Sequence, residues 1–135
     1  EPLFFEQGLT LTSQVDEGIT VSGDEEALRR VLEILLDNAQ KYSSPGGETQ
    51  VTLHRRGRNH CALTVANQGE PIPPEARRQI FQRFYRADPA RSRNGSFGLG
   101  LSIAEGIVAQ HHGTIDVTCA GGFNRFRVEL PCRQE

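Results

Sequence analysis

The chain is organised around an amphipathic segment at residues 28–43. Apolar side chains recur there at every third or fourth position, as a helix with one core-facing side requires: Leu28, Val31, Leu32, Leu35, Leu36 and Ala39. At about 100° per residue, Asn38 lies at the edge of this stripe, and Lys41 follows on the same flank. An amide and a cation therefore share one ledge beside the predicted core. Whether Lys41, the only lysine in the chain, serves a ligand or only solvates the helix stays open on these residues alone.

Alternation of apolar and polar residues predicts six short strands with one buried face. They are residues 9–15, 19–22, 50–56, 61–67, 114–119 and 125–130. Turn residues at 57–59 and 120–122 join the last four into two hairpins. By alternation Asn67 falls on the inward face, where a buried amide needs a hydrogen-bond partner. An Asx turn opening residues 67–69 is the other interpretation of Asn67.

Two further stretches lie between the hairpins. Residues 71–75 are predicted to begin a short helix that carries Ile80 and Phe81, and residues 86–97 form a polar segment of a length typical of a lid or binding loop. Glycines at 94–101 lead into a second periodic helix that ends at 111–113. Such a run leaves the first N–H groups of a helix free to hold an anion such as phosphate. A flexible loop is the alternative, since the spacing is neither Walker nor Rossmann.

The order of these elements predicts the fold class. Asp24 is expected to cap the first helix, and the breaker cluster at 43–47 ends it. Strands occur in both halves, separated by helices, and bury one face of the sheet. We expect an α/β fold, a two-layer sandwich in which about three helices cover one face of a mixed, mostly antiparallel sheet. The ligand ledge is expected between the two layers.

Composition narrows the class of protein. With 135 residues, 36% apolar and 24% charged, the chain has the size of one compact domain. A net charge of −2 disfavours general nucleic-acid binding, although arginines crowd residues 77–93. Three cysteines without C-x-x-C spacing support neither a disulfide framework nor a zinc site. The pair His111 and His112 is interpreted as helix-end chemistry, because no third ligand follows at a usual spacing. No apolar run approaches the about 20 residues that a membrane span needs.

Four segments carry a resemblance to a known family. Residues 35–43 read LLDNAQKYS, residues 67–73 NQGEPIP, residues 80–88 IFQRFYRAD and residues 95–101 GSFGLGL. In this order they resemble the Asn box, first glycine box, phenylalanine box and second glycine box of the ATP-binding catalytic domain of bacterial sensor histidine kinases. That domain has the Bergerat fold shared with gyrase and chaperone ATPases. The resemblance implies one ATP-binding catalytic domain over residues 1–135, excised from a longer chain, with an ATP lid at about 86–98.

The resemblance also implies site residues. The catalytic positions would be Asn38, which offers its amide oxygen to Mg²⁺, and Lys41, which contacts the phosphates of ATP. Asn67 would accept a hydrogen bond from the adenine amino group, where the family usually has an Asp. The other nucleotide-binding positions would be Tyr42 near the nucleoside, Gly69 where the base approaches closely, Ile72 in the same box, Arg86 in the lid, and Gly98, Leu99, Gly100 and Leu101 at the phosphates.

Three departures from the family pattern matter. Ile34, one turn before Asn38, stands where the family commonly has another Asn and the hydrolytic relatives a Glu that activates water, which argues against self-contained ATP hydrolysis. Pro71 replaces a second glycine, and the usual Gly-Thr before Phe126 is missing. Both suggest an altered pocket wall rather than a lost one. Because one neutral amide is a poor ligand for Mg²⁺, the metal is predicted to bind only with nucleotide.

The function expected from this resemblance is that of a protein histidine kinase domain. It would bind Mg·ATP and donate the γ-phosphoryl group to a histidine on a separate dimerisation and phosphoacceptor domain, which in turn serves a response regulator. Alone, the chain is expected to be monomeric and to show little turnover, because none of its histidines begins the His-Glu or His-Asp helix of family acceptors: His54, His60, His111 and His112. The expected setting is the cytoplasmic part of a membrane-bound bacterial sensor, with no membrane or nucleic-acid contact of its own.

Three alternatives remain open at this point. Ile34 and Asn67 favour a degenerate module that senses nucleotide or docks a partner without kinase activity. An anti-sigma serine kinase of the same fold is the second alternative. A nucleic-acid contact through the arginines of residues 77–93 is the third, and salt-dependent binding would reveal it.

Overall fold

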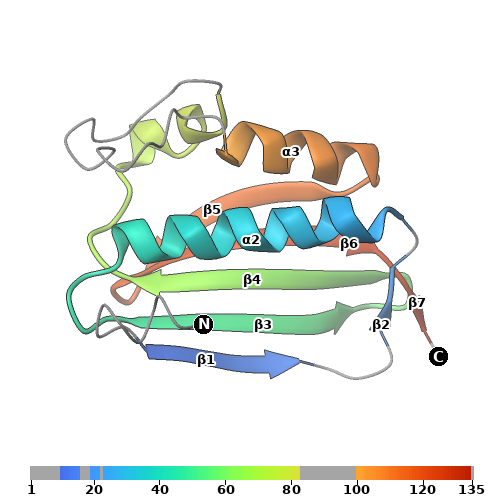
Figure 1. Ribbon diagram of the computed structural model, residues 1–135, viewed down its shortest axis with the longest axis horizontal. Coiled ribbons are helices and arrows are strands. Elements are labelled where there is room, and N and C mark those ends of the chain that lie inside the picture. Colours follow the sequence, from blue (N-terminus) through green and yellow to red (C-terminus); the bar gives the residue numbers. More distant parts are fainter. Residues whose placement is uncertain (1–9, 16–18, 22, 83–99, 135) are drawn as a thin grey trace.

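The computed structural model describes residues 10–15, 19–21, 23–82 and 100–134 of the chain. They form two layers, in which the helices α2 (Glu25–Tyr42) and α3 (Gly100–Gln110) pack beside each other over a β-sheet (Figure 1). Buried residues of both helices and of the sheet belong to one hydrophobic cluster, so the helices cover the same face. The predicted two-layer α/β sandwich is confirmed.

Five strands form the main sheet, in the order β1-β3-β4-β6-β5. Their bounds are Thr10–Val15 for β1, Glu48–Arg56 for β3, His60–Gln68 for β4, Thr114–Ala120 for β5 and Phe123–Pro131 for β6. β1 pairs parallel with β3, and the other neighbours are antiparallel. A separate two-stranded sheet pairs β2 (Ile19–Thr20) with β7 (Arg133–Gln134). The sheet is therefore mixed and mostly antiparallel, as expected.

Helix α2 begins where its capping residue predicts. The Asp24 carboxylate accepts hydrogen bonds from the backbone N–H groups of Glu26 and Ala27, at 3.0 and 3.1 Å. The helix ends before Ser43, whose hydroxyl donates to the carbonyl of Ala39 at 2.6 Å. Asp24 thus satisfies two of the donors that every helix start leaves unpaired.

The end of α3 is joined to the start of α2 by a histidine. His111 Nε2 accepts from the Asp24 backbone N–H at 3.1 Å, so Nδ1 carries the proton and donates to the carbonyl of Ile107 at 2.8 Å. His112 follows with a φ of 63°, a left-handed conformation that stops the helix. The two histidines thus terminate α3, in agreement with their predicted role at the helix end, and His111 also links the two helices.

The core lies between the helices and the central strands. Its largest fully buried side chains include Phe126 and Val128 on β6, Val65 on β4, and Leu35 on α2. The Phe81 ring meets Phe126 edge to face, with 6.2 Å between ring centroids. Buried residues alternate along β6. On β4, Cys61 and Val65 belong to the core cluster and Leu63 packs against it, so the predicted inward faces of both strands are confirmed.

The segment after β4 differs from its prediction. Instead of one short helix, two separate 3₁₀ helices span Pro74–Ala76 and Gln79–Phe81. A segment this short forms few i→i−4 bonds, and an isolated helix of one or two turns is marginal. Ile80 and Phe81 nevertheless reach the core, as expected.

Both predicted hairpins are present. β3 and β4 pair through residues 49–56 and 60–67, and β5 and β6 are joined by two glycines at positive φ, Gly121 at 62° and Gly122 at 82°. Two such residues form the tight turn that matches the twist of antiparallel strands. This turn lies at the same end of the molecule as the C-terminal ends of α2 and β4 (Figure 1).

Candidate functional site

The last turn of α2 carries three of the predicted site residues. Asn38, Lys41 and Tyr42 are all half-buried, next to the buried Ala39 of the core-facing stripe. Asn38 and Lys41 are three positions apart and therefore neighbours on the helix surface. Lys41 lies where the carbonyl end of the helix favours a cation.

Asn67 lies at the end of β4 and is 1% exposed. Its Nδ2 donates to the backbone carbonyl of Tyr42 at 3.2 Å. The partner expected for this buried amide is thus the carbonyl end of α2. An amide held by its nitrogen has its oxygen oriented as an acceptor. Asn67 therefore joins the end of β4 to the end of α2, and its side-chain oxygen remains as a hydrogen-bond acceptor at the candidate site.

Gly69 directly follows β4 and lies against the end of α2. A Cβ atom placed on this residue would lie 2.5 Å from the Tyr42 carbonyl oxygen, so only glycine fits here without backbone movement. The Gly69 N–H donates to the carbonyl of Gly122 at 3.1 Å, and the Ser44 N–H donates to the carbonyl of Gln68 at 2.9 Å. The first glycine box is thus fixed between the end of α2 and the β5–β6 turn.

Ile72 is held by a residue that the sequence patterns did not single out. The Ile72 N–H donates to Asn124 Oδ1 at 3.1 Å, and Asn124 Nδ2 donates to the carbonyl of Glu70 at 2.8 Å. Asn124 is 1% exposed. The missed signal was the alternation of β6, because Asn124 has the same parity as the inward residues Phe126 and Val128.

The start of α3 lies against the middle of α2. A Cβ atom on Gly100, the first residue of α3, would lie 3.4 Å from Ile34 Cγ2. The Ile34 side chain thus occupies the space beside the helix start with apolar atoms. Leu101 is half-buried and packs at the edge of the core. Gly100 and Leu101 are therefore on the same side of the sheet as Asn38 and Lys41.

The remaining predicted positions lie outside the described residues. They are Arg86, Gly98 and Leu99, together with the lid at about 86–98. Their roles stay predictions.

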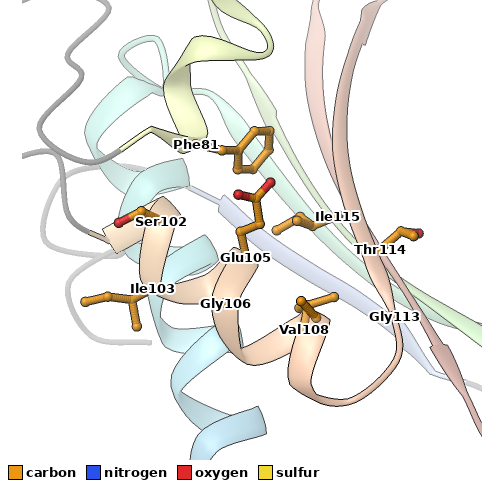
Figure 2. A pocket seen from close by; sticks show the side chains of 10 residues that line it. Phe81, Ser102, Ile103, Glu105, Gly106, Val108, Gly113, Thr114 and Ile115 are labelled. Atoms are coloured by element: carbon orange, nitrogen blue, oxygen red, sulfur yellow. The ribbon is translucent and has the colours of Figure 1, made fainter.

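A groove of about 800 Å³ lies on the other side of α3 and does not coincide with these site residues. Figure 2 shows it between α3, the start of β5 and the Phe81 ring, with the Glu105 carboxylate directed towards that ring. Its lining residues are Phe81, Ser102, Ile103, Glu105, Gly106, Val108, Ala109, Gly113, Thr114 and Ile115. Among the described residues this lining is mostly apolar and its charged side chain, Glu105, is negative, which does not suit nucleotide phosphates.

Comparison with known proteins identifies the family of the chain. The family model described as histidine kinase-, DNA gyrase B-, and HSP90-like ATPase matches residues 23–134, which include every described site residue. The chain belongs to this family. The resemblance seen in its four sequence boxes is thereby confirmed, together with the Bergerat-type fold.

The relatives of this ATPase-family chain are sensor kinases. It is 49% identical to the signal transduction histidine-protein kinase/phosphatase MprB of Mycolicibacterium smegmatis, over 78% of this chain and 22% of that protein. It is 42% identical to the sensor histidine kinase CusS of Escherichia coli O6:H1, over 97% of this chain and 27% of that protein. The chain thus spans about a quarter of the length of these curated relatives.

A solved structure of full-length ShkA in complex with AMPPNP contains a similar domain. The TM-score is 0.85 at 27% identity, and the match covers 99% of this chain and 28% of that one. In the part of this family member that the structure describes, no helix is long and apolar enough to cross a membrane.

Proposed function

We propose that this chain is the catalytic domain of a sensor histidine kinase, which binds Mg·ATP and donates the γ-phosphoryl group to a histidine on a separate dimerisation and phosphoacceptor domain. The observation that carries the proposal is the meeting of α2, β4 and the first glycine box through Asn67, Tyr42 and Gly69. It brings an oriented amide acceptor to the helix turn that bears Asn38 and Lys41. An amide acceptor suits the base of a nucleotide, and a cation suits its phosphates.

In this proposal the buried amide recognises the base. Asn67 Nδ2 is committed to the Tyr42 carbonyl at 3.2 Å, which favours Oδ1 as the acceptor for the adenine amino group. A guanine would present an oxygen to the same acceptor and leave both groups unpaired, which is unfavourable in a buried site. Tyr42, Gly69 and Ile72 would line the base and nucleoside.

The phosphates would lie between α2 and the start of α3. Lys41 would contact them directly, and Arg86 would reach them from the lid. Backbone N–H groups of Gly98, Leu99, Gly100 and Leu101 would hold phosphate oxygens, since the first N–H groups of a helix have no partner within it.

The donor set fits Mg²⁺ only as part of a metal–nucleotide complex. Asn38 contributes a single neutral oxygen, and among the described residues no three His, Cys, Asp or Glu side chains lie together. Mg²⁺ prefers six oxygen ligands and retains several waters, so phosphates and water would supply the rest. Bound in this way, the metal would neutralise the charge that develops on the transferring phosphoryl group.

Hydrolysis by the chain alone is not expected. Ile34, one turn before Asn38, has no group to activate water, and its Cγ2 atom lies beside Gly100. Nor is His111 suited as a phosphoacceptor, because both of its ring nitrogens are engaged within the fold. Catalysis would therefore consist of positioning and charge stabilisation, with the acceptor supplied by another domain and the phosphoryl group passed on to a response regulator.

Labelled ATP tests this proposal. The longer protein that contains this chain should take up the γ-phosphoryl label in an acid-labile, alkali-stable form, and the isolated chain should take up none. Asn38→Ala should abolish labelling of the longer protein. Absence of label from a longer protein that still binds ATP would contradict kinase activity and support a nucleotide-sensing module instead.

A further inference from the structure

Asn124 is a buried amide in the middle of a polar row. It lies on β6 between Asn67 of β4 and Cys119 of β5, which are its register partners on the two neighbouring strands. All three side chains share parity with the core-facing residues of their strands. Asn124 is 1% exposed, in a position where an apolar residue would continue the core pattern.

The hydrogen bonds of Asn124 hold the first glycine box from both sides of Pro71. Oδ1 accepts from the Ile72 N–H at 3.1 Å, and Nδ2 donates to the Glu70 carbonyl at 2.8 Å. The Cys119 thiol also donates to Oδ1, at 2.9 Å. Pro71 itself has no N–H. The amide thus pairs with the loop as a neighbouring strand would, through one donor and one acceptor.

This arrangement connects the two departures in the pocket wall. Pro71 stands in the first glycine box where a second glycine is usual, and Asn124 stands just before Arg125 and Phe126, where the usual Gly-Thr is missing. The Asn124 side chain forms hydrogen bonds to Glu70 and Ile72, the residues on either side of Pro71. The two changes therefore act on one short loop, residues 70–72, whose Ile72 belongs to the proposed base-binding wall.

We propose that Asn124 is a positioning residue of the nucleotide site, which holds loop 70–72 in its binding conformation before the base arrives. This role rests on the proposed function. Pro71 restricts the loop by fixing one φ angle, and Asn124 restrains both neighbours of that proline. A loop ordered in advance loses less conformational freedom on binding, so a larger share of the molecules is competent to bind.

Hydrogen exchange and calorimetry on Asn124→Ala test this role. Exchange of the Ile72 amide in the nucleotide-free chain should become about tenfold faster, because its acceptor is gone. The Ser44 amide, which bonds the Gln68 carbonyl on the other side of the site, should be unaffected. The dissociation constant for ADP should rise about tenfold, as expected when the competent fraction falls. The rise should be equal with and without Mg²⁺, because the loop is distant from the phosphates in the proposed geometry.

Two further variants separate positioning from general stability. Asn124→Asp keeps the acceptor for Ile72 but cannot donate to Glu70, so it should give an intermediate ADP affinity. Thr118→Ala, at an exposed position beside Cys119 on the opposite face of β5, should bind ADP like the unchanged chain.

The outcomes separate this inference from the function on which it rests. Unchanged ADP affinity in Asn124→Ala, or faster exchange at Ser44 and Ile72 alike, would overturn the positioning role while leaving the nucleotide site intact. No ADP binding by the unchanged chain would overturn both, and the exchange rate of Ile72 would then show only that Asn124 is structural.

Discussion

Two buried side-chain amides form hydrogen bonds to the backbone at the candidate site. Asn67 and Asn124 face each other across β4 and β6, and each bonds backbone from a distant part of the chain. Alternation in the sequence placed Asn67 on the inward face, and the family pattern supplied its proposed role. Neither could name its partner, because a carbonyl 25 residues away in sequence becomes a neighbour only after α2 packs on the sheet. Asn124 was missed although it obeys the same alternation.

Replacing Asn67 by Asp tests how much the hydrogen bond to the Tyr42 carbonyl stabilises the fold. A carboxylate can still accept from an amino group, but it cannot donate to the Tyr42 carbonyl, which would lose its partner. We expect Asn67→Asp to lower the free energy of unfolding by about 1 to 3 kcal/mol, the range for an unsatisfied buried polar group. Urea denaturation measures this. Asn59→Asp, the same change at an exposed turn residue, should have little effect, and equal stabilities of the two variants would contradict the contact.

Lys41 is expected to contribute directly to nucleotide affinity. Charge-assisted hydrogen bonds contribute about 1.5 to 3 kcal/mol each, so Lys41→Ala should weaken ATP binding by roughly tenfold or more. Arg30→Ala is the matched control, since it removes an exposed cation near the other end of the same helix. Fluorescence competition with a labelled nucleotide would give both affinities. Loss of affinity in the Arg30 variant alone would move the phosphate site away from Lys41.

The buried Cys61 thiol makes the stability of the fold depend on pH in the alkaline range. Burial raises the pKa of Cys61 from 9.0 to about 12, and the nearby Cys132 and Glu129 add to the shift. The unfolded chain therefore loses this proton at lower pH than the folded chain does, and stability falls as pH rises from 9.0 towards 12. The slope should be about 1.4 kcal/mol per pH unit.

Thermal unfolding between about pH 8 and pH 11 would reveal this linkage. Cys61→Ala is less stable throughout because of the lost side chain, but its stability should fall less steeply above pH 9.0. Parallel curves for the two proteins would contradict the raised pKa.

The periodicity of the sequence predicted the helices and strands themselves better than it predicted which strands pair. The apolar stripe of residues 28–43 and the expected cap Asp24 indicated a helix, and α2 (Glu25–Tyr42) is that helix with that cap. Alternation located the strands, but it contains no information about neighbours, so the parallel pairing of β1 with β3 and the small β2–β7 sheet could not be predicted. The link between His111 and Asp24 was equally out of reach, because it joins the ends of two helices that are distant in sequence.

The cap of α2 offers a test at this scale. Asp24→Ala removes the acceptor for the N–H groups of Glu26 and Ala27 and should lower the free energy of unfolding by about 1 kcal/mol. Asp24→Asn keeps a side-chain oxygen and should stay within a few tenths of the unchanged protein. Chemical denaturation of the three proteins would decide, and equal losses in both variants would show that the negative charge, rather than the cap, stabilises the helix start.

For the whole molecule, the fold brings the ends of several elements to one place. The C-terminal ends of α2 and β4 and the β5–β6 turn gather at one end of the sandwich (Figure 1), and the start of α3 lies against the middle of α2. The sequence predicted the two layers and the ledge between them. It did not predict that the apolar groove would lie on the far side of α3, because that groove depends on how α3, β5 and Phe81 pack together.

We propose that the surface formed by the end of α2, the end of β4 and the start of α3 binds ATP together with Mg²⁺. Calorimetric titration of ATP with and without Mg²⁺, on the unchanged chain and on Asn38→Ala, tests it most directly. We predict micromolar to sub-millimolar binding that Mg²⁺ strengthens, and loss of that metal effect in Asn38→Ala. Undetectable binding in the millimolar range, with a folded chain, would contradict the claim, and an equal metal effect in Asn38→Ala would contradict the role of Asn38.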